Sequence, residues 1–200
     1  MHYANIKTAD SANGIGVRVT LFVSGCTNHC KGCFQKETWD FNYGEEYTKE
    51  TEDYIINELS KSYYSGLTIL GGEPLEPENQ EEICKLVKRV KKELPKKNIW
   101  LYTGFNFQSN LTIREDKQTE FTDEIFRNID ILVDGKFDID KKNPSILFRG
   151  STNQLIIDMK KSLFMKRIII HDLTYKKLNI DELNSIYKEY IESVNSYEVY

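Results

Sequence analysis

Three of the four cysteines in this 200-residue chain lie within eight residues of one another. Cys26, Cys30 and Cys33 form a C-x3-C-x2-C motif, in which one short loop can wrap a metal centre while its backbone N–H groups point toward the sulfurs. Thiolate ligands suit Zn²⁺ or an iron–sulfur cluster. In a reducing compartment a tight cysteine group is more typical of a metal site than of a disulfide framework. We therefore predict that these three residues bind a metal centre.

The choice between zinc and iron depends on whether the chain offers a fourth ligand, because structural zinc sites usually have four. His29 directly precedes Cys30, and adjacent residues rarely chelate one metal ion. Cys84 falls in an apolar stretch with helical periodicity, where a free cysteine is usually a small buried hydrophobe. Three thiolates would instead bind three irons of a four-iron cluster and leave the fourth iron open, which is typical of a reactive centre. A zinc-binding interaction module is the distant alternative.

Other residues able to bind a ligand follow the ends of predicted strands. Gly71-Gly72-Glu73-Pro74 follows one strand, Thr103-Gly104 the next, and Asp134-Gly135-Lys136 a third. Paired glycines allow the backbone to approach a ligand closely, and carbonyl or carboxylate oxygens accept hydrogen bonds from an ammonium group. Because ligands bind at the carboxyl ends of strands in α/β folds, we expect these groups and the cysteine loop to form one site.

The elements that must position these groups alternate between strand and helix. Period-two or short apolar runs predict strands at 17–23, 67–70, 99–103, 131–134, 146–148 and 167–170. Helical periodicity predicts helices at 49–64, capped by Thr48, and at 79–94, with Asn79 and Glu82 as a capping box, and further helices at 122–129 and 181–195.

This alternation predicts an α/β fold with a parallel sheet and helical crossovers. Too few units are present for a complete eight-fold barrel, which needs about 250 residues. We therefore expect a partial, open βα barrel rather than a doubly wound sheet. The absence of repeats and linkers predicts a single domain over 1–200, in which 160–200 is a strand–helix extension.

Composition excludes several classes of protein. The chain has 27 basic and 31 acidic side chains and a net charge of −4, which gives no basic footprint for a nucleic acid. The Lys-rich run 88–93 is the solvated face of an amphipathic helix. No apolar run approaches the roughly 20 residues that span a bilayer, and the N-terminus lacks a secretory pattern. We expect a soluble, cytoplasmic protein without nucleic-acid or membrane partners.

Taken together, these motifs resemble those of the radical S-adenosylmethionine (SAM) enzymes. The cysteine motif carries that resemblance. Three further stretches are similar to the activating proteins of anaerobic (class III) ribonucleoside-triphosphate reductases. They are Leu70–Pro74, Leu132–Phe137 and Arg149–Gln154, and the likeness as a whole covers roughly residues 1–160. The resemblance implies an oxidoreductase that cleaves SAM reductively at a [4Fe-4S] cluster and generates a glycyl radical on the reductase.

The resemblance also implies roles for individual residues. Cys26, Cys30 and Cys33 would ligate the cluster, SAM would complete the fourth iron, and no catalytic side chain beyond the cluster is implied. Gly32, Cys33 and Phe34 would line the SAM pocket. Six further positions are implied to bind or orient SAM: Gly71, Gly72, Glu73, Thr103, Asp134 and Lys136. Arg149–Gln154 shows no pattern of metal ligands or of acid–base groups, and we treat it as a family marker.

The implied partners are the glycyl radical subunit of the reductase and a flavodoxin-like or other reductant. An alternative keeps the radical SAM chemistry but directs it at formate lyase or a small molecule.

Overall fold

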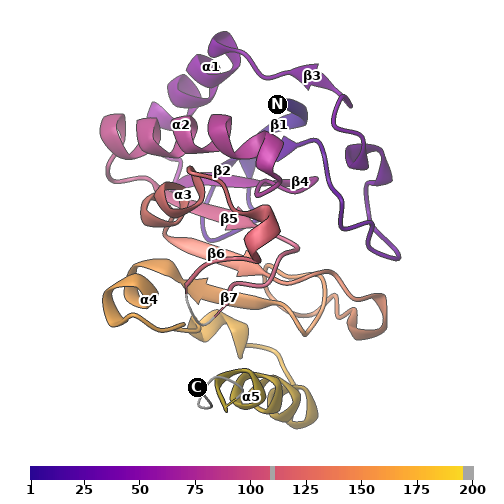
Figure 1. The fold of residues 1–200 in the computed structure, drawn as a ribbon. Helices are drawn as coiled ribbons and strands as arrows, with labels where there is room; N and C mark the ends of the chain where they lie inside the picture. Colours follow the sequence, from indigo (N-terminus) through magenta and orange to yellow (C-terminus); the bar gives the residue numbers. More distant parts are fainter. Residues whose placement is uncertain (109–110, 196–200) are drawn as a thin grey trace.

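A computed structural model describes residues 1–108 and 111–195 of the chain (Figure 1). Its strands form one seven-stranded sheet in the order β3-β1-β2-β4-β5-β6-β7. The strands are β1 (His2–Asp10), β2 (Arg18–Val23), β3 (Glu45–Glu46), β4 (Gly66–Gly71), β5 (Asn98–Tyr102), β6 (Ile131–Asp134) and β7 (Leu155–Asp158). The α-helices are α1 (Lys49–Ser60), α2 (Pro77–Glu93), α3 (Thr122–Asn128), α4 (Met159–Met165) and α5 (Ile180–Asn195).

The centre of the sheet is parallel and its edges are antiparallel. Strands β2, β4, β5 and β6 pair in parallel in that order, whereas β1 runs antiparallel to β2 and β7 antiparallel to β6. Helices α1, α2 and α3 provide the crossovers between the parallel strands. The predicted α/β sheet with helical crossovers is thus confirmed for the four central strands, and it is an open sheet.

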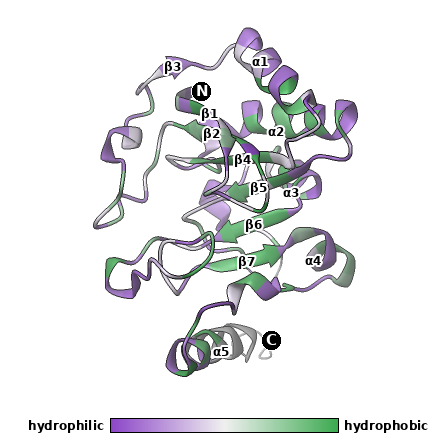
Figure 2. Cartoon of the chain, turned by 180° about the vertical axis from the view of Figure 1, so that it is seen from behind, coloured by the Kyte–Doolittle hydropathy of each residue, from purple (hydrophilic) through white to green (hydrophobic). Residues whose placement is uncertain are grey.

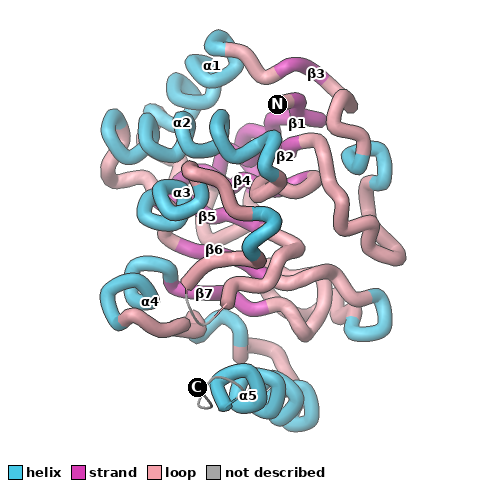
Figure 3. Tube along the Cα trace, in the orientation of Figure 1, coloured by secondary structure: helices cyan, strands magenta, loops and turns pink. Residues whose placement is uncertain are grey.

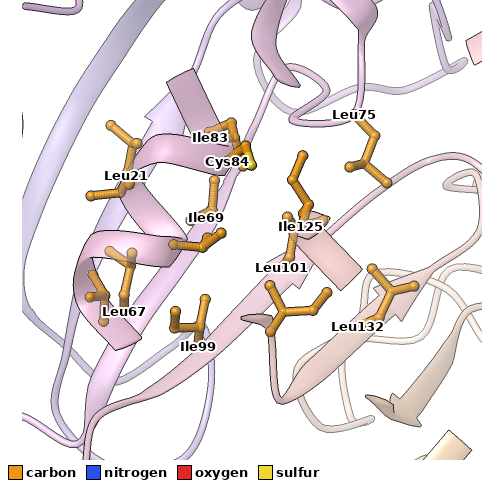
Figure 4. Packing of buried hydrophobic residues seen from close by; sticks show 14 of the residues in the cluster. Leu21, Leu67, Ile69, Leu75, Ile83, Cys84, Ile99, Leu101, Ile125 and Leu132 are labelled. Carbon is orange, nitrogen blue, oxygen red and sulfur yellow. The ribbon is translucent and has the colours of Figure 1, made fainter. Parts of the chain in front are cut away.

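The main core lies between the sheet and these helices. Leu21, Leu67, Ile69 and Leu101 from the strands pack with Ile83 of α2 and are fully buried (Figure 4). Because successive side chains of a strand point to opposite faces, the neighbouring positions form a second cluster on the other face of the sheet. That smaller cluster consists of Trp100, Ile131, Val133, Ile156 and Leu173. Strands β5 to β7 are accordingly hydrophobic along their length in Figure 2.

Two predicted strands are wrong, and three observed strands, β1, β3 and β7, were not predicted. Residues 146–148 form no strand, and Phe148 has a positive φ of 55°. Residues 167–170 form only a single bridge, between Ile170 and Ile157 of β7. The three observed strands were missed because β1 is largely polar and half-exposed, β3 has only two residues and β7 only four, so none shows the long apolar run of a central strand.

The capping predictions had mixed outcomes. Thr48 caps α1 in a capping box with Thr51, as expected at that terminus. Helix α2 instead begins at Pro77, with Glu76 at the N-cap. Asn79 lies inside the helix and its amide is used elsewhere. A proline at the first helical position already suits the helix start, because that N–H needs no intrahelical partner.

The carboxyl ends of the parallel strands all lie at the same edge of the sheet. Figure 3 shows that loops follow β2 and β6 there, and Figure 1 shows both loops projecting from the same edge. No helix in the described part of the chain is long and apolar enough to cross a membrane.

Candidate functional site

The cysteine loop leaves the sheet at the end of β2 and is held by main-chain hydrogen bonds. The N–H of Gly25 donates to the Thr38 carbonyl oxygen at 2.9 Å, and the N–H of Cys26 donates to that of Trp39 at 3.3 Å. Gly25 has a φ of +89°, and a Cβ there would lie 2.3 Å from the ring of Phe41. Glycine is therefore required at this bend, and residues 38–41 fold back over the start of the loop.

All four cysteine thiols are free. Cys26 is buried, while Cys30 and Cys33 are half-buried and joined by a turn in which the Cys33 N–H donates to the Cys30 carbonyl oxygen at 3.1 Å. Burial raises the pKa of the Cys26 thiol to about 11, and the N–H groups of Asn28 and His29, which point at its sulfur, oppose that rise. Amides directed at a sulfur are what a thiolate ligand of an iron–sulfur cluster uses, so the loop fits such a group.

His29 and Cys84 were the two other residues considered as metal ligands, and each packs against other side chains. The ring of His29 packs against Trp39, with centroids 4.5 Å apart. Cys84 belongs to the main core, as predicted, and lies beside Ile83 in Figure 4. Among the described residues, no three His, Cys, Asp or Glu side chains form a group that could hold one metal ion. In a four-iron cluster each cysteine would bind a different iron, so the sulfurs need not converge on one point.

Glu73 connects three of the loops at this edge of the sheet. Its Oε1 accepts hydrogen bonds from the Thr103 hydroxyl at 2.7 Å and the Leu75 N–H at 3.0 Å. Its Oε2 accepts from the Gly104 N–H at 2.6 Å and the Asn28 amide at 3.0 Å. The side chain is fully buried, and burial raises its pKa to about 7 against the effect of these donors. Glu73 thus orders the ends of β4 and β5 and the cysteine loop around one carboxylate.

The paired glycines bring the end of β4 against the same loop. A Cβ at Gly72 would lie 2.6 Å from the Gly25 carbonyl oxygen and 2.9 Å from that of Thr38. Gly71 has a φ of +117°, and a Cβ there would lie 2.6 Å from the main-chain nitrogen of Val23. These glycines were expected to let the backbone approach a ligand; in this structure they allow a close approach to the chain's own backbone.

Asp134 is the last residue of β6, and Lys136 lies two residues beyond it. Asp134 is buried and accepts from the Phe107 N–H at 2.9 Å, and burial raises its pKa to about 7. Burial also raises the pKa of Cys30, whereas the charge of Lys136 and the N–H of Phe137 lower it. Lys136 therefore lies near the cysteine loop, although β4 and β5 separate β6 from β2 in the sheet.

Phe34 is exposed, with 76% of its surface accessible. Its ring lies 5.3 Å from that of Phe137, and the Lys142 ammonium lies 5.3 Å from its centroid. Gly32, two residues earlier, has a φ of +78° and faces the side chain of Ile139. The segment after the third cysteine thus contacts the loop after β6 and leaves one face of Phe34 open.

Sequence reasoning missed the second carboxylate of this site. Glu76 is fully buried and accepts from the Thr27 N–H at 2.7 Å and the Thr27 hydroxyl at 2.6 Å. It also pairs with the Lys117 ammonium at 2.6 Å. Asn79 donates to the carbonyl oxygens of Ser24 at 2.9 Å and Glu73 at 3.0 Å. In the sequence, Glu76 resembles an ordinary acidic residue at a helix start, so only its position three residues after Glu73 could have indicated a role.

The fold and this site define an α/β protein built to hold one iron–sulfur cluster. Residues 12–157 match the family described as a 4Fe-4S single cluster domain. The chain is 42% identical over 158 residues to the "Anaerobic ribonucleoside-triphosphate reductase-activating protein" of Escherichia coli (strain K12), which covers 78% of this chain and 97% of that protein.

Two further relatives bear the same name. The protein of Pasteurella multocida (strain Pm70) is 42% identical over 78% of this chain and 96% of its own length. That of Enterobacteria phage T4 is 43% identical over 77% of this chain and 92% of its own. The chain belongs to the family of anaerobic ribonucleoside-triphosphate reductase-activating proteins, which confirms the resemblance drawn from its motifs.

Proposed function

We propose that this protein is a radical SAM activase that generates the glycyl radical of an anaerobic ribonucleoside-triphosphate reductase. The observation that carries the proposal is the connection of the cysteine loop, through Glu73, to the ends of β4 and β5. When bound, the cluster and SAM supply one-electron chemistry that yields methionine and a 5′-deoxyadenosyl radical, which takes a hydrogen atom from a glycine of the reductase. The electron comes from a flavodoxin-like or other reductant.

The cysteine loop would hold the cluster. Cys26, Cys30 and Cys33 would each bind one iron of the [4Fe-4S] cluster, and the fourth iron would be left for SAM. Gly32, Cys33 and Phe34 would line the SAM pocket. The open face of Phe34 suits a flat adenine ring, because aromatic rings stack favourably.

The ends of the parallel strands would orient the rest of SAM. Carbonyl oxygens of Gly71 and Gly72 would accept from its ammonium group, while Glu73 would hold the surrounding loops in place. Thr103 and Asp134 would orient the methionine part of SAM. Lys136 would neutralise its carboxylate, since its charge already acts on the nearby Cys30 thiol.

The open sheet supports this assignment of roles. We propose that it is the partial barrel of a radical SAM domain, formed by one domain over the whole chain, with the site at the carboxyl ends of its parallel strands. An open edge would admit a protein loop carrying the target glycine. The proposal includes a cytoplasmic location, where reductase and reductant meet.

The test is reconstitution with iron and sulfide without oxygen, followed by mixing with SAM, a reductant and the reductase. We expect about four irons per chain and a carbon-centred doublet in the electron paramagnetic resonance (EPR) spectrum of the reductase. A reductase with the target glycine replaced by alanine is the control and gives no doublet. Zinc in place of iron, or SAM cleavage with no radical on the reductase, would overturn the proposal. A radical formed only on formate lyase would favour the alternative substrate.

A further inference from the structure

The segment Arg149–Gln154, which the motifs left without a role, packs along the loop that follows β6. The Asn153 amide donates to the Lys136 carbonyl oxygen at 2.9 Å. The Gln154 amide donates to the Gly135 carbonyl oxygen, also at 2.9 Å. Two neighbouring side chains of this segment therefore hold two neighbouring main-chain carbonyls directly after Asp134.

The side-chain amide of Gln154 has different partners on its two sides. Its Oε1 accepts from the N–H groups of Gly150 at 2.9 Å and Ser151 at 3.2 Å, within its own segment. Its Nε2 makes the bond to Gly135. One planar group thus joins the turn of its own segment to the loop after β6, and it uses both its acceptor and its donor to do so.

The loop held by Gln154 in turn contacts the cysteine loop. The ring of Phe137 lies 5.3 Å from that of Phe34, and the Phe137 N–H points at the Cys30 sulfur. A Cβ at Gly32 would lie 2.9 Å from the side chain of Ile139. The residues that surround two of the cysteines therefore depend on where this loop lies.

The segment itself is anchored on its far side. Arg149 is buried, and its guanidinium donates to the carbonyl oxygens of Gln154 at 2.6 Å and Thr174 at 2.5 Å. A Cβ at Gly150 would lie 2.9 Å from the Phe137 ring, so glycine leaves the space in which that ring sits. The segment is a fixed support against which the loop after β6 is placed.

We propose that Gln154 is a positioning residue that holds Gly135–Phe137 against the loop carrying Cys30. The inference rests on the proposed function only for the role of Cys30 as a cluster ligand. Through this contact Gln154 places the Phe137 N–H and the Lys136 charge beside that sulfur. It acts at a distance from SAM and touches no reacting atom.

Gln154→Glu tests the donor of the side-chain amide separately from its acceptor. The carboxylate keeps the acceptor for Gly150 and Ser151 but loses the donor to Gly135. In the full chain without cluster, we expect hydrogen exchange at the Gly135 and Cys33 amides to become about 2- to 10-fold faster, as the loss of one net hydrogen bond predicts. Asn128→Asp is the control, because it removes an amide donor to a carbonyl oxygen, that of Glu124, together with its bond to the Glu124 carboxylate, at the end of α3 and away from the cysteine loop.

A second readout uses the reconstituted protein. Gln154→Glu should retain its iron but show altered EPR g values of the reduced cluster with SAM, whereas Asn128→Asp should match the unaltered protein. Should Gln154→Glu not fold, Asn153→Ala removes only the bond to Lys136 and is expected to speed exchange at the same amides. Unchanged exchange at Cys33 together with unchanged g values would overturn the inference. Failure of the unaltered protein to cleave SAM would instead count against the proposed function, because the exchange measurement needs neither cluster nor SAM.

Discussion

The hydroxyl of Thr103 donates a hydrogen bond of 2.7 Å to Oε1 of Glu73, and this bond joins the carboxyl ends of β5 and β4. Asn28 of the cysteine loop donates to the other oxygen of the same carboxylate at 3.0 Å. Two positions predicted for SAM binding are therefore in direct contact, and both are tied to the loop that carries the thiols.

Glu73→Gln should leave one main-chain donor unpaired although the shape of the side chain is nearly unchanged. An amide has one acceptor oxygen, so in either orientation the N–H of Leu75 or of Gly104 loses its acceptor. A buried donor without a partner costs about 1–3 kcal/mol, so we expect hydrogen exchange at that amide to become about 5- to 100-fold faster. Glu46→Gln, at an exposed position of β3, is the control; unchanged exchange at both amides would contradict the role of Glu73.

Cys30→Ala should abolish cluster assembly while leaving the fold intact. Cys30 is half-buried in a loop, so loss of its sulfur removes one iron ligand but little core packing. Iron analysis and visible absorbance after reconstitution measure the first effect, and far-ultraviolet circular dichroism measures the second. Cys84→Ala is the matched control, because Cys84 lies in the core and its loss should leave the iron content unchanged. Full iron and full activity in Cys30→Ala would refute the ligand assignment.

Changes at Glu76 and Thr27 should have graded effects. Glu76→Ala removes the acceptor for the Thr27 N–H and hydroxyl and leaves the largely buried Lys117 without its counter-ion. We expect a loss of about 2–3 kcal/mol in the free energy of unfolding. Thr27→Val removes the hydroxyl bond to Glu76 and the bond from Lys117 to that hydroxyl, but it keeps the main-chain bond and the ion pair, and it should cost about 1 kcal/mol. Equal losses in the two variants would show that the main-chain bond and the ion pair contribute nothing.

Asp134 should make the stability of the protein without cluster depend on pH. Burial raises its pKa to about 7 in the folded state, whereas an unfolded aspartate titrates near 4. Between these values the folded state binds more protons, so the Asp134 contribution to stability falls as pH rises from about 4 to about 7. Asp134→Asn cannot titrate and lacks this dependence.

The measurement compares urea unfolding of Asp134→Asn and the unaltered protein from pH 4 to pH 8. The free energy of unfolding of the variant relative to the unaltered protein should rise by an amount on the order of 4 kcal/mol up to pH 7 and then stay level. Parallel stability curves over the whole range would show that the Asp134 carboxyl group titrates normally in the fold.

Local patterns in the sequence were enough to predict the cysteine ligands and the central elements. The spacing of Cys26, Cys30 and Cys33 predicts a metal-binding loop whatever surrounds it, because ligands so close in the chain can meet without help from other elements. The periodicity of α2, β4 and β6 could be recognised in the sequence for a related reason. These elements are buried on at least one face, so their apolar residues follow the geometry of a single helix or strand.

Only the tertiary structure decided how the site is held together. Asn28 and Glu73 are 45 residues apart in the sequence, and Thr27 and Glu76 are 49 apart. Nothing in either neighbourhood shows that these groups meet, since hydrogen bonds between distant segments depend on how the sheet and loops pack. The raised pKa values of Glu73 and Asp134 likewise arise from burial, which is a property of the assembled fold and not of any stretch of chain.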